Sequence, residues 1–318
     1  MGKLPYEKIK RKILIRKDSI GAIGVGPGER PIEEVINYGI VNIDKPRGPT
    51  SHQISDYVKK ILKIKKAGHS GTLDPNVTGV LPVALGRATR IVQALLPVGK
   101  EYVSLMYLHK EVEEKKLLAT MNSFVGAIKQ RPPLKSAVRR IERIRKVYYI
   151  DILETEGKYV LFRIGCQAGT YIRTLCHQIG QRLGTGAHMV ELRRTKVGNF
   201  NESTAVKLQD LVDAYYYYKN EENEKYLRKI IQPVEVGVAH LPKIWVLDSS
   251  VLPLSNGRDL AVPGVSKLET GIKQGDTVAL MTLKNELIGL GTAIKNSEEI
   301  IENVKGICVR TNKVFIHL

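Results

Sequence analysis

Residues 68–90 bring together side chains suited to acid–base or nucleophilic chemistry. The stretch begins Gly-His-Ser-Gly-Thr-Leu-Asp-Pro, so a single carboxylate, Asp74, follows closely on the imidazole of His69 and two hydroxyl residues. A lone carboxylate can act as a nucleophile or as a base. Asp-Pro can also simply begin a turn. The interspersed glycines and prolines predict a loop, and loops often carry function.

Four other segments accompany this stretch in the first half of the chain: Ile43–Ser51, Lys100–Tyr102, Gln130–Pro133 followed by Ser136-Ala137, and Gly169–Leu175. In this order, and together with residues 68–90, they resemble the TruB family of pseudouridine synthases. Five ordered matches make a specific signal.

The resemblance implies that Asp74 is the catalytic carboxylate. The family's reaction breaks the N1–C1′ bond of a uridine and joins C5 of the turned base to C1′. A single carboxylate can serve, as a nucleophile on the sugar or as a base at C2′, and the residues leave both routes open. We expect this carboxylate to face a flipped-out nucleotide inside a closed, RNA-lined pocket.

The resemblance also assigns supporting residues. Tyr102 would stack on the uracil, because a base flipped out of structured RNA loses its stacking partners. Arg173 would pair with Asp74 and favour its ionised form, although it could instead be a surface arginine that binds phosphate. His69 could occupy the space that the base vacates or be structural. Lys45 would hold its loop or contact a phosphate, and Leu175 would line the substrate pocket.

The expected reaction is neither a redox step nor a hydrolysis, so we predict no cofactor and no metal. The chain has three cysteines, an odd number, and no two of them are closely spaced in sequence. This argues against a disulfide framework. With His177 and His188 nearby, zinc was the alternative to weigh, but no short-spaced ligand pair is present. The cysteines are Cys166, Cys176 and Cys308.

The chain is strongly basic, with 50 Lys+Arg against 32 Asp+Glu, a net charge of +18 and a pI near 9.7. Such an excess favours a polyanionic partner, because cations that neutralise phosphates release condensed counterions. The charge clusters: residues 128–147 hold eight basic residues and one acid. We interpret this strip as a binding surface for RNA phosphates.

Within the family, the basic extension before residue 40, Leu192–Thr195 and the C-terminal segment resemble the archaeal dyskerin branch. That likeness implies substrate ribosomal RNA, or transfer RNA, with an H/ACA guide RNA and small H/ACA core proteins as partners. Residues 260–276 resemble part of a PUA domain, an RNA-binding module.

Three alternatives remain open. The first is a transfer RNA pseudouridine synthase that needs no guide. The second is a non-catalytic RNA-binding scaffold, in which Asp74 only starts a turn. The third, a nucleoside hydrolase or glycosidase, would be expected to carry a second carboxylate.

Periodicity predicts the elements that position these residues. Apolar residues at helical spacing follow the cap at Thr50, and they recur at 114–128 and 171–183. The run Tyr215–Tyr218 is interpreted as a helix end that covers a core edge. Strands are expected in the catalytic part at 102–108, 147–153 and 159–166, and in the C-terminal part at 278–283, 287–294, 307–310 and 314–318.

These elements predict an α+β fold, with a mixed or antiparallel central sheet flanked by helices and a small C-terminal β-barrel. We expect a basic N-terminal extension at 1–35 that packs on the barrel, a catalytic domain at 36–245 and a PUA domain at 246–318. The N-terminus carries no recognisable secretion signal, and no apolar run is long enough to span a membrane. We therefore expect a cytoplasmic protein.

Overall fold

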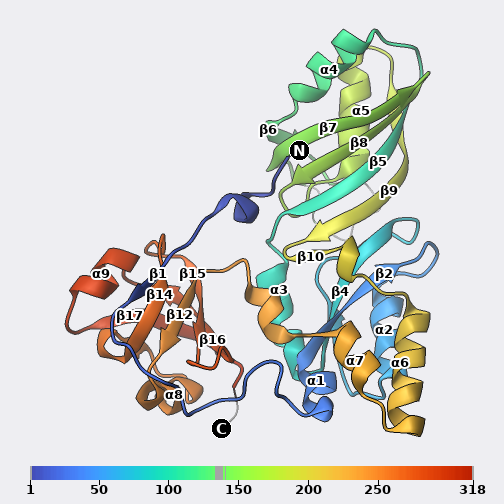
Figure 1. Ribbon diagram of the computed structural model, residues 1–318. Helices are drawn as coiled ribbons and strands as arrows, with labels where there is room; N and C mark the ends of the chain where they lie inside the picture. Colours follow the sequence, from blue (N-terminus) through green and yellow to red (C-terminus); the bar gives the residue numbers. More distant parts are fainter. Residues whose placement is uncertain (1, 133–138, 140, 317–318) are drawn as a thin grey trace.

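The computed structural model describes residues 2–132, 139 and 141–316, and within them the chain forms two β-sheets with helices packed around them (Figure 1). The larger sheet supports the predicted catalytic segments. Its strand order is β11 (Ile231–Pro233), β2 (Gly39–Lys45), β4 (Thr78–Leu85), β9 (Ala187–Val197), β5 (Lys100–Leu108), β8 (Tyr159–Cys166), β7 (Arg143–Glu156) and β6 (Gly126–Gln130), with β3 (Ala67–His69) paired to β4 and β10 (Phe200–Asn201) paired to β9.

The two halves of this sheet meet where β4 runs parallel to β9, at Thr78↔Arg193 and Gly79↔Arg194. Gly79 adopts a φ of 103°, and a Cβ there would lie 2.2 Å from the carbonyl oxygen of Arg194. Only glycine allows two backbones to approach so closely in this conformation. The junction therefore brings the strand that follows the Asp74 loop onto β9.

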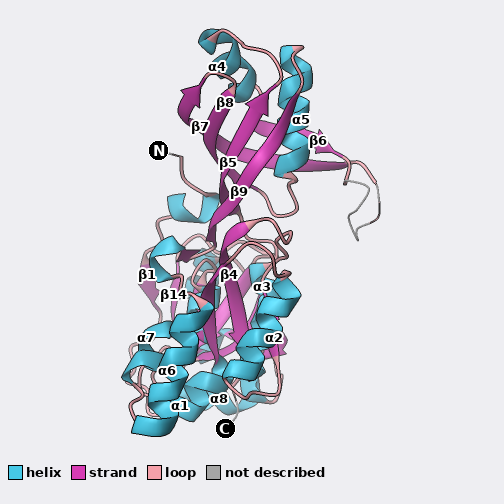
Figure 2. Cartoon of the chain, turned by 90° about the vertical axis from the view of Figure 1, so that its right-hand side faces the viewer, coloured by secondary structure: helices cyan, strands magenta, loops and turns pink. Residues whose placement is uncertain are grey.

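Helices cover both halves of the large sheet (Figure 2). On one half α4 (Glu114–Asn122) packs beside α5 (Ile172–Leu183). On the other, α2 (Ser51–Ile61) packs beside α6 (Leu208–Glu221). Shorter helices complete this half: α1 (Ile32–Tyr38), the 3₁₀ turn η2 (Gly86–Ile91), α3 (Val92–Leu95) and α7 (Lys225–Ile230).

The predicted helix behind Thr50 is confirmed, because the Thr50 side chain caps α2 by accepting from the Gln53 N–H. The helix predicted at 171–183 is also confirmed. The helix predicted at 114–128 is wrong in its second half, because α4 ends at Asn122 and β6 follows. Gly126, at a φ of 116°, lies outside helical geometry, and the buried residues beyond it alternate as in a strand.

The smaller sheet contains the C-terminal strands and one N-terminal strand. β1 (Ile13–Ile15) pairs antiparallel with β14 (Val265–Glu269), although some 250 residues separate them in sequence. The predicted strands 307–310 and 314–318 are corrected: β17 runs unbroken over Ile307–Val314, and 317–318 lie outside the described residues. The other elements are β12 (Lys243–Val246), β13 (Leu260–Ala261), β15 (Thr277–Met281), β16 (Leu287–Ala293), α8 (Asp248–Ser255) and α9 (Ser297–Glu302).

The two sheets share one hydrophobic cluster. Ile40 and Val80 of the large sheet and Trp245 and Phe315 of the smaller-sheet region belong to it, and all four are buried. An Arg30–Glu235 ion pair with an N···O distance of 2.7 Å lies between the parts, and Glu235 also accepts from a backbone N–H of β16. The smaller sheet is therefore fixed to the catalytic half by shared core packing.

Among the described residues, no helix combines the length and the apolar character that a membrane crossing requires.

Candidate active site

The loop that carries Asp74 connects β3 to β4 and is held from below by α2. The hydroxyl of Ser51, the first residue of α2, donates to the Leu73 carbonyl at 3.1 Å and accepts from the Leu73 N–H at 2.8 Å. Asp74 starts a turn in which its carbonyl accepts from the Val77 N–H at 3.0 Å. Both backbone groups of the residue before Asp74 are therefore fixed, which limits where its carboxylate can point.

Lys45, the last residue of β2, is buried beneath the same loop. Its ammonium donates to the carbonyls of Pro46, Pro75 and Val77 at 2.9, 3.0 and 2.9 Å. Burial lowers the pKa of Lys45, and the negative charge of Asp74 opposes that shift. All three ammonium N–H groups are used and the residue has no exposed surface. Of the two predicted alternatives, these contacts favour holding the loop over contacting a phosphate.

Arg173 lies in the first turn of α5 and reaches the Asp74 loop. Its Nη2 atom donates to the Asp74 Oδ2 atom at 2.9 Å. The two residues are 99 positions apart in sequence, and the fold brings them together at the surface between the two halves of the large sheet. The arrangement places a fixed cation beside the only carboxylate of the loop.

The expected closed pocket is not present in the chain by itself. The side chains of Arg173 and Asp74 are 56% and 59% exposed. RNA forms part of the wall of the expected cavity, so the exposure of the pair in the chain alone leaves that expectation a prediction. A pair this exposed is screened by water and contributes little to stability, so stability does not explain it.

Tyr102 lies on β5, half-buried, opposite Arg194 of β9. The Arg194 guanidinium lies close enough to the Tyr102 hydroxyl to act on its pKa. Burial raises the pKa of Tyr102, Arg194 opposes the shift, and the negative charge of Asp74 adds to it. Tyr102 is therefore a neutral phenol within electrostatic reach of the carboxylate, as the proposed stacking role requires.

Arg194 is the residue that the sequence analysis missed. It is 1% exposed, and its Nε and Nη2 atoms donate to the carbonyls of Val80 at 2.8 Å and Gly71 at 3.1 Å. It thereby ties β9 to the catalytic loop at Gly71. Its charge also acts on the pKa values of Lys45 and His69. The available signal was the pair Arg193-Arg194: neighbouring residues of a strand point to opposite faces, so one of the two must face inward.

His69 and Leu175 are placed differently from each other. His69 ends β3 and is half-buried; burial, then Arg194 and His52, lower its pKa, so the imidazole is neutral at pH 7. Its Nδ1 atom is buried without a hydrogen-bond partner among the described residues. Leu175 has no exposed surface and packs in the core beneath α5. Its predicted substrate contact is therefore corrected to a packing position in this conformation.

The described part of the basic strip borders the site. The side chain of Gln130, at the end of β6, exchanges two hydrogen bonds with the backbone of Tyr171, and Arg145 of β7 donates to the Gly169 carbonyl. Both contacts lie just before Arg173. The predicted strip members Lys135 and Arg140, like Ser136-Ala137, lie outside the described residues.

The thiols offer no nucleophile, because burial raises the pKa of Cys166, Cys176 and Cys308 to about 12 in each case. All three are free cysteines. Within the part of the chain that the structure describes, no three His, Cys, Asp or Glu side chains are grouped so that they could hold a metal ion. The chemical resources of the site are therefore one carboxylate, two guanidinium groups, a phenol and an imidazole.

Comparison with known families identifies models that cover most of the chain. The model for the N-terminal domain of TruB family pseudouridylate synthases matches residues 59–172, and that for the C-terminal domain of tRNA pseudouridylate synthase B matches 173–239. A DKCLD (NUC011) domain model matches residues 3–55, and a PUA domain model matches 242–315.

Full-length relatives agree with these matches. A probable tRNA pseudouridine synthase B of Pyrococcus furiosus is 57% identical over 97% of the chain and 92% of its own length. The corresponding protein of Nanoarchaeum equitans is 52% identical over 98% of the chain and 90% of its own length.

Two solved structures share the whole fold. The chain superposes on a protein in a crystal structure of a Cbf5-Nop10-Gar1 complex with a TM-score of 0.94, at 57% identity, over 99% of the chain and 96% of that protein. A protein in a structure of an H/ACA RNP bound to a substrate RNA containing 2′-deoxyuridine gives a TM-score of 0.93, at 54% identity, over 99% and 98%.

Proposed function

The chain belongs to the TruB family of pseudouridine synthases, and we propose that it isomerises specific uridines of ribosomal RNA under the direction of an H/ACA guide RNA. The observation that supports the isomerisation chemistry is the 2.9 Å ion pair between Asp74, on the loop between β3 and β4, and Arg173 of α5. The likeness to a protein of an RNA-bound H/ACA particle carries the guide-directed part.

The reaction is balanced without any external reagent. The N1–C1′ bond breaks, the uracil turns, and a C5–C1′ bond forms; C5 loses its hydrogen and N1 gains one. Asp74 either attacks C1′ or removes the C2′ proton, so both routes assign the essential step to its ionised carboxylate. Arg173 orients that carboxylate through its 2.9 Å hydrogen bond and stays paired with it when RNA displaces water from the site.

RNA itself completes the pocket in this proposal. The exposure of Asp74 and Arg173 leaves room above them for a nucleotide, and a flipped uridine would cover both. Tyr102 stacks on the uracil, and Arg194 lies opposite it on the neighbouring strand β9. Desolvation by the bound RNA then strengthens the Asp74–Arg173 interaction relative to the free enzyme.

The remaining residues act as supports. Lys45 holds the turn after Asp74 through the Pro75 and Val77 carbonyls. His69 is neutral, its Nδ1 has no hydrogen-bond partner among the described residues, and it occupies the space that the flipped base vacates. Leu175 supports α5 from the core, so that Arg173 in the first turn of that helix keeps its position.

We assign three segments to this function. Residues 1–35 form a basic extension, of which β1 pairs with β14. The predicted catalytic domain, 36–245, ends at about residue 242, because β12 (Lys243–Val246) belongs to the smaller sheet. The rest of the chain, predicted as 246–318, forms an RNA-binding PUA domain, whose family model matches 242–315. Guide RNA and small H/ACA core proteins are the proposed partners, with no membrane involved. The three free cysteines support a reducing, cytoplasmic location.

The test is reconstitution with a guide RNA and the core proteins, followed by mapping of pseudouridine in a ribosomal RNA fragment. Modification only at the position that the guide specifies is the expected result. Free uracil among the products would indicate a hydrolase, and guide binding without any pseudouridine would indicate a scaffold.

A guide-independent activity on transfer RNA is the second candidate, because the curated relatives are named tRNA pseudouridine synthase B. Unmodified transfer RNA incubated with the purified chain, with and without guide RNA, separates the two. Modification without a guide would assign this activity to the chain.

A further inference from the structure

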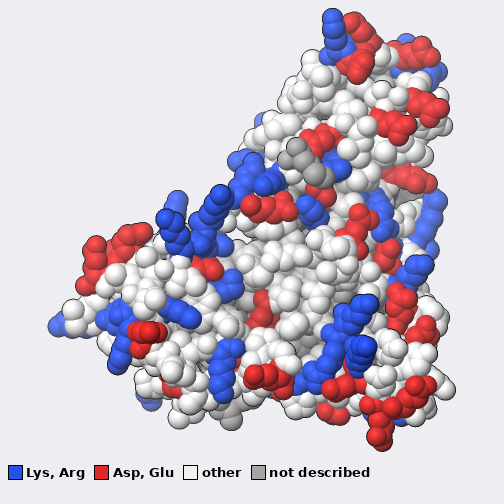
Figure 3. Space-filling model, in the orientation of Figure 1, with Lys and Arg blue, Asp and Glu red and all other residues white. Residues whose placement is uncertain are grey.

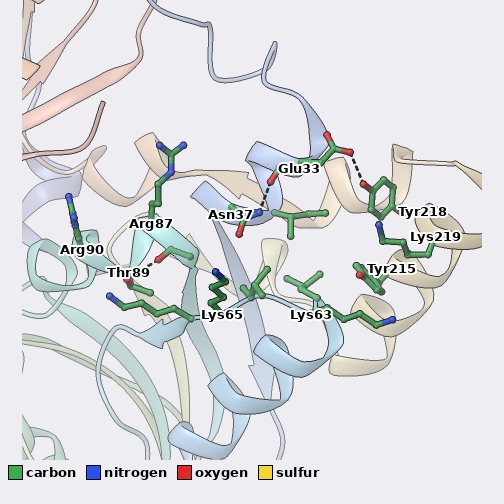
Figure 4. Close-up of a pocket in the computed structure, with 15 residues that line it drawn as sticks. Glu33, Asn37, Lys63, Lys65, Arg87, Thr89, Arg90, Tyr215, Tyr218 and Lys219 are labelled. Carbon is green, nitrogen blue, oxygen red and sulfur yellow. Dashed lines mark hydrogen bonds between the residues drawn. The ribbon is translucent and has the colours of Figure 1, made fainter. Parts of the chain in front are cut away.

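A second basic site lies away from the Asp74 loop. A groove of about 670 Å³ opens between α1, the end of α2, η2 and α6 (Figure 4). Lys and Arg side chains gather beside α1 and α2 on the face shown in Figure 3. The groove is lined by six cations: Lys63, Lys65, Lys66, Arg87, Arg90 and Lys219.

The negative charge nearby does not neutralise these cations. Glu33 is the single acid among the described lining residues, and its carboxylate accepts from the Tyr218 hydroxyl at 2.8 Å. Glu34 lies close by and pairs with Arg87 at 3.1 Å. The side chains of the exposed Lys65 and Lys66 form no hydrogen bond or ion pair with any described residue.

Lys63 stands at a position where glycine is usual. It follows the end of α2 with a φ of 53°, the left-handed conformation in which helices commonly end on glycine. A side chain in this conformation is less stable than glycine would be there. A lysine after a helix C-terminus is stabilised by the helix dipole, but this effect is limited to the last turn. It therefore does not explain the cations that η2 and α6 contribute to the groove.

The wall of the groove on α6 combines aromatic rings with charge. Tyr215 and Tyr218 lie with ring centroids 6.1 Å apart, and the Lys219 ammonium lies 4.5 Å from the Tyr218 ring centroid. The tyrosine run was predicted to cover a core edge. Tyr215 and Tyr218 do pack against the core, and they also line the groove. Basic residues beside aromatic faces are the combination that nucleic acids prefer.

The groove is separate from the catalytic loop. Ser51 at the start of α2 holds Leu73, whereas Lys63 follows the other end of the helix. Eleven residues at 1.5 Å each make α2 roughly 16 Å long. A phosphate in the groove therefore belongs to a part of the RNA that lies away from the reacting uridine.

We propose that this groove binds the phosphodiester backbone of RNA and so holds a segment remote from the reacting uridine. The inference rests on the proposed RNA-modifying function. It adds that affinity, and not the chemical step, depends on these lysines, because a phosphate contact strengthens binding without touching the reacting atoms.

The test compares two charge-matched double variants of the full chain. K65Q/K66Q removes two unpaired cations from the groove, and K110Q/K115Q removes two exposed lysines from the α4 side of the molecule. Binding of a labelled H/ACA guide RNA and of unmodified transfer RNA is measured by fluorescence anisotropy from about 50 to about 200 mM salt. Inorganic pyrophosphate serves as a competitor.

The groove variant should bind RNA more weakly, and its plot of log K against log salt should be shallower by about 1.4–1.8, from roughly 0.7–0.9 per lost phosphate contact. The control should keep the wild-type slope. Equal slopes for both variants would overturn the groove proposal. If the wild-type chain still forms pseudouridine in that case, the proposed function stands. Lysine-dependent binding of pyrophosphate without RNA binding would assign the groove to small anions instead. Failure of the wild type to bind either RNA would overturn both proposals.

Discussion

Replacing Asp74 by Asn separates catalysis from stability more sharply than any other change in this chain. The substitution keeps the shape of the side chain and removes its charge. The lost ion pair with Arg173 is more than half exposed on both sides, so it contributes about 0.2–1 kcal/mol to the free energy of unfolding. The expected fall in Tm is therefore roughly 4 °C at most. Loss of an essential nucleophile or base costs about 10⁴- to 10⁶-fold in rate.

The assay measures pseudouridine formation in single turnover on guide-bound RNA, alongside thermal unfolding and guide-RNA affinity. A matched control is Asp56→Asn, which removes a surface carboxylate that pairs with Lys59 at 2.6 Å and Lys60 at 2.8 Å on α2. We expect normal pseudouridine formation by the control and none by Asp74→Asn. Turnover within tenfold of wild type in Asp74→Asn would refute the assignment of the chemistry to this carboxylate.

Three further predictions concern Lys45, Tyr102 and His240. Lys45→Met removes three hydrogen bonds, of which only the one to the Val77 carbonyl is fully buried, and should lower the urea-unfolding free energy by about 1–3 kcal/mol, with reduced activity; an unchanged urea midpoint would show that Lys45 does not hold the loop. Tyr102→Ala should weaken substrate binding by about 1–3 kcal/mol, roughly 5- to 150-fold, whereas Tyr102→Phe should keep most affinity; equal losses would argue against stacking. Burial lowers the pKa of His240 to about 4 in the folded chain, whereas in the unfolded chain it is about 6.5. Between these two pH values the unfolded chain binds a proton at His240 and the folded chain does not. Stability should therefore fall as pH drops from about 6.5 to about 4, and His240→Gln should show a smaller fall in urea midpoints over that range.

The sequence by itself determined the chemistry-bearing loop and several of its supports. Local patterns sufficed for the helix behind Thr50, because a cap and an amphipathic stripe are encoded within a few residues. The motifs around Asp74, Tyr102 and Arg173 indicated the family before any contact was known. Their spatial meeting was expected only through the resemblance, since nothing local relates position 74 to position 173.

Tertiary structure decided what depended on contacts between distant segments. The segment after Asn122 keeps apolar residues at spacings that suit a helix, but pairing with β7 makes it a strand. Arg194 became visible as a site residue only when β9 was placed against β4 and β5, because burial is a property of neighbours and not of the residue type. The open position of Asp74 was decided in the same way: its loop faces the junction of two sheet halves, and whether a side chain there meets protein or water depends on what the rest of the chain leaves uncovered.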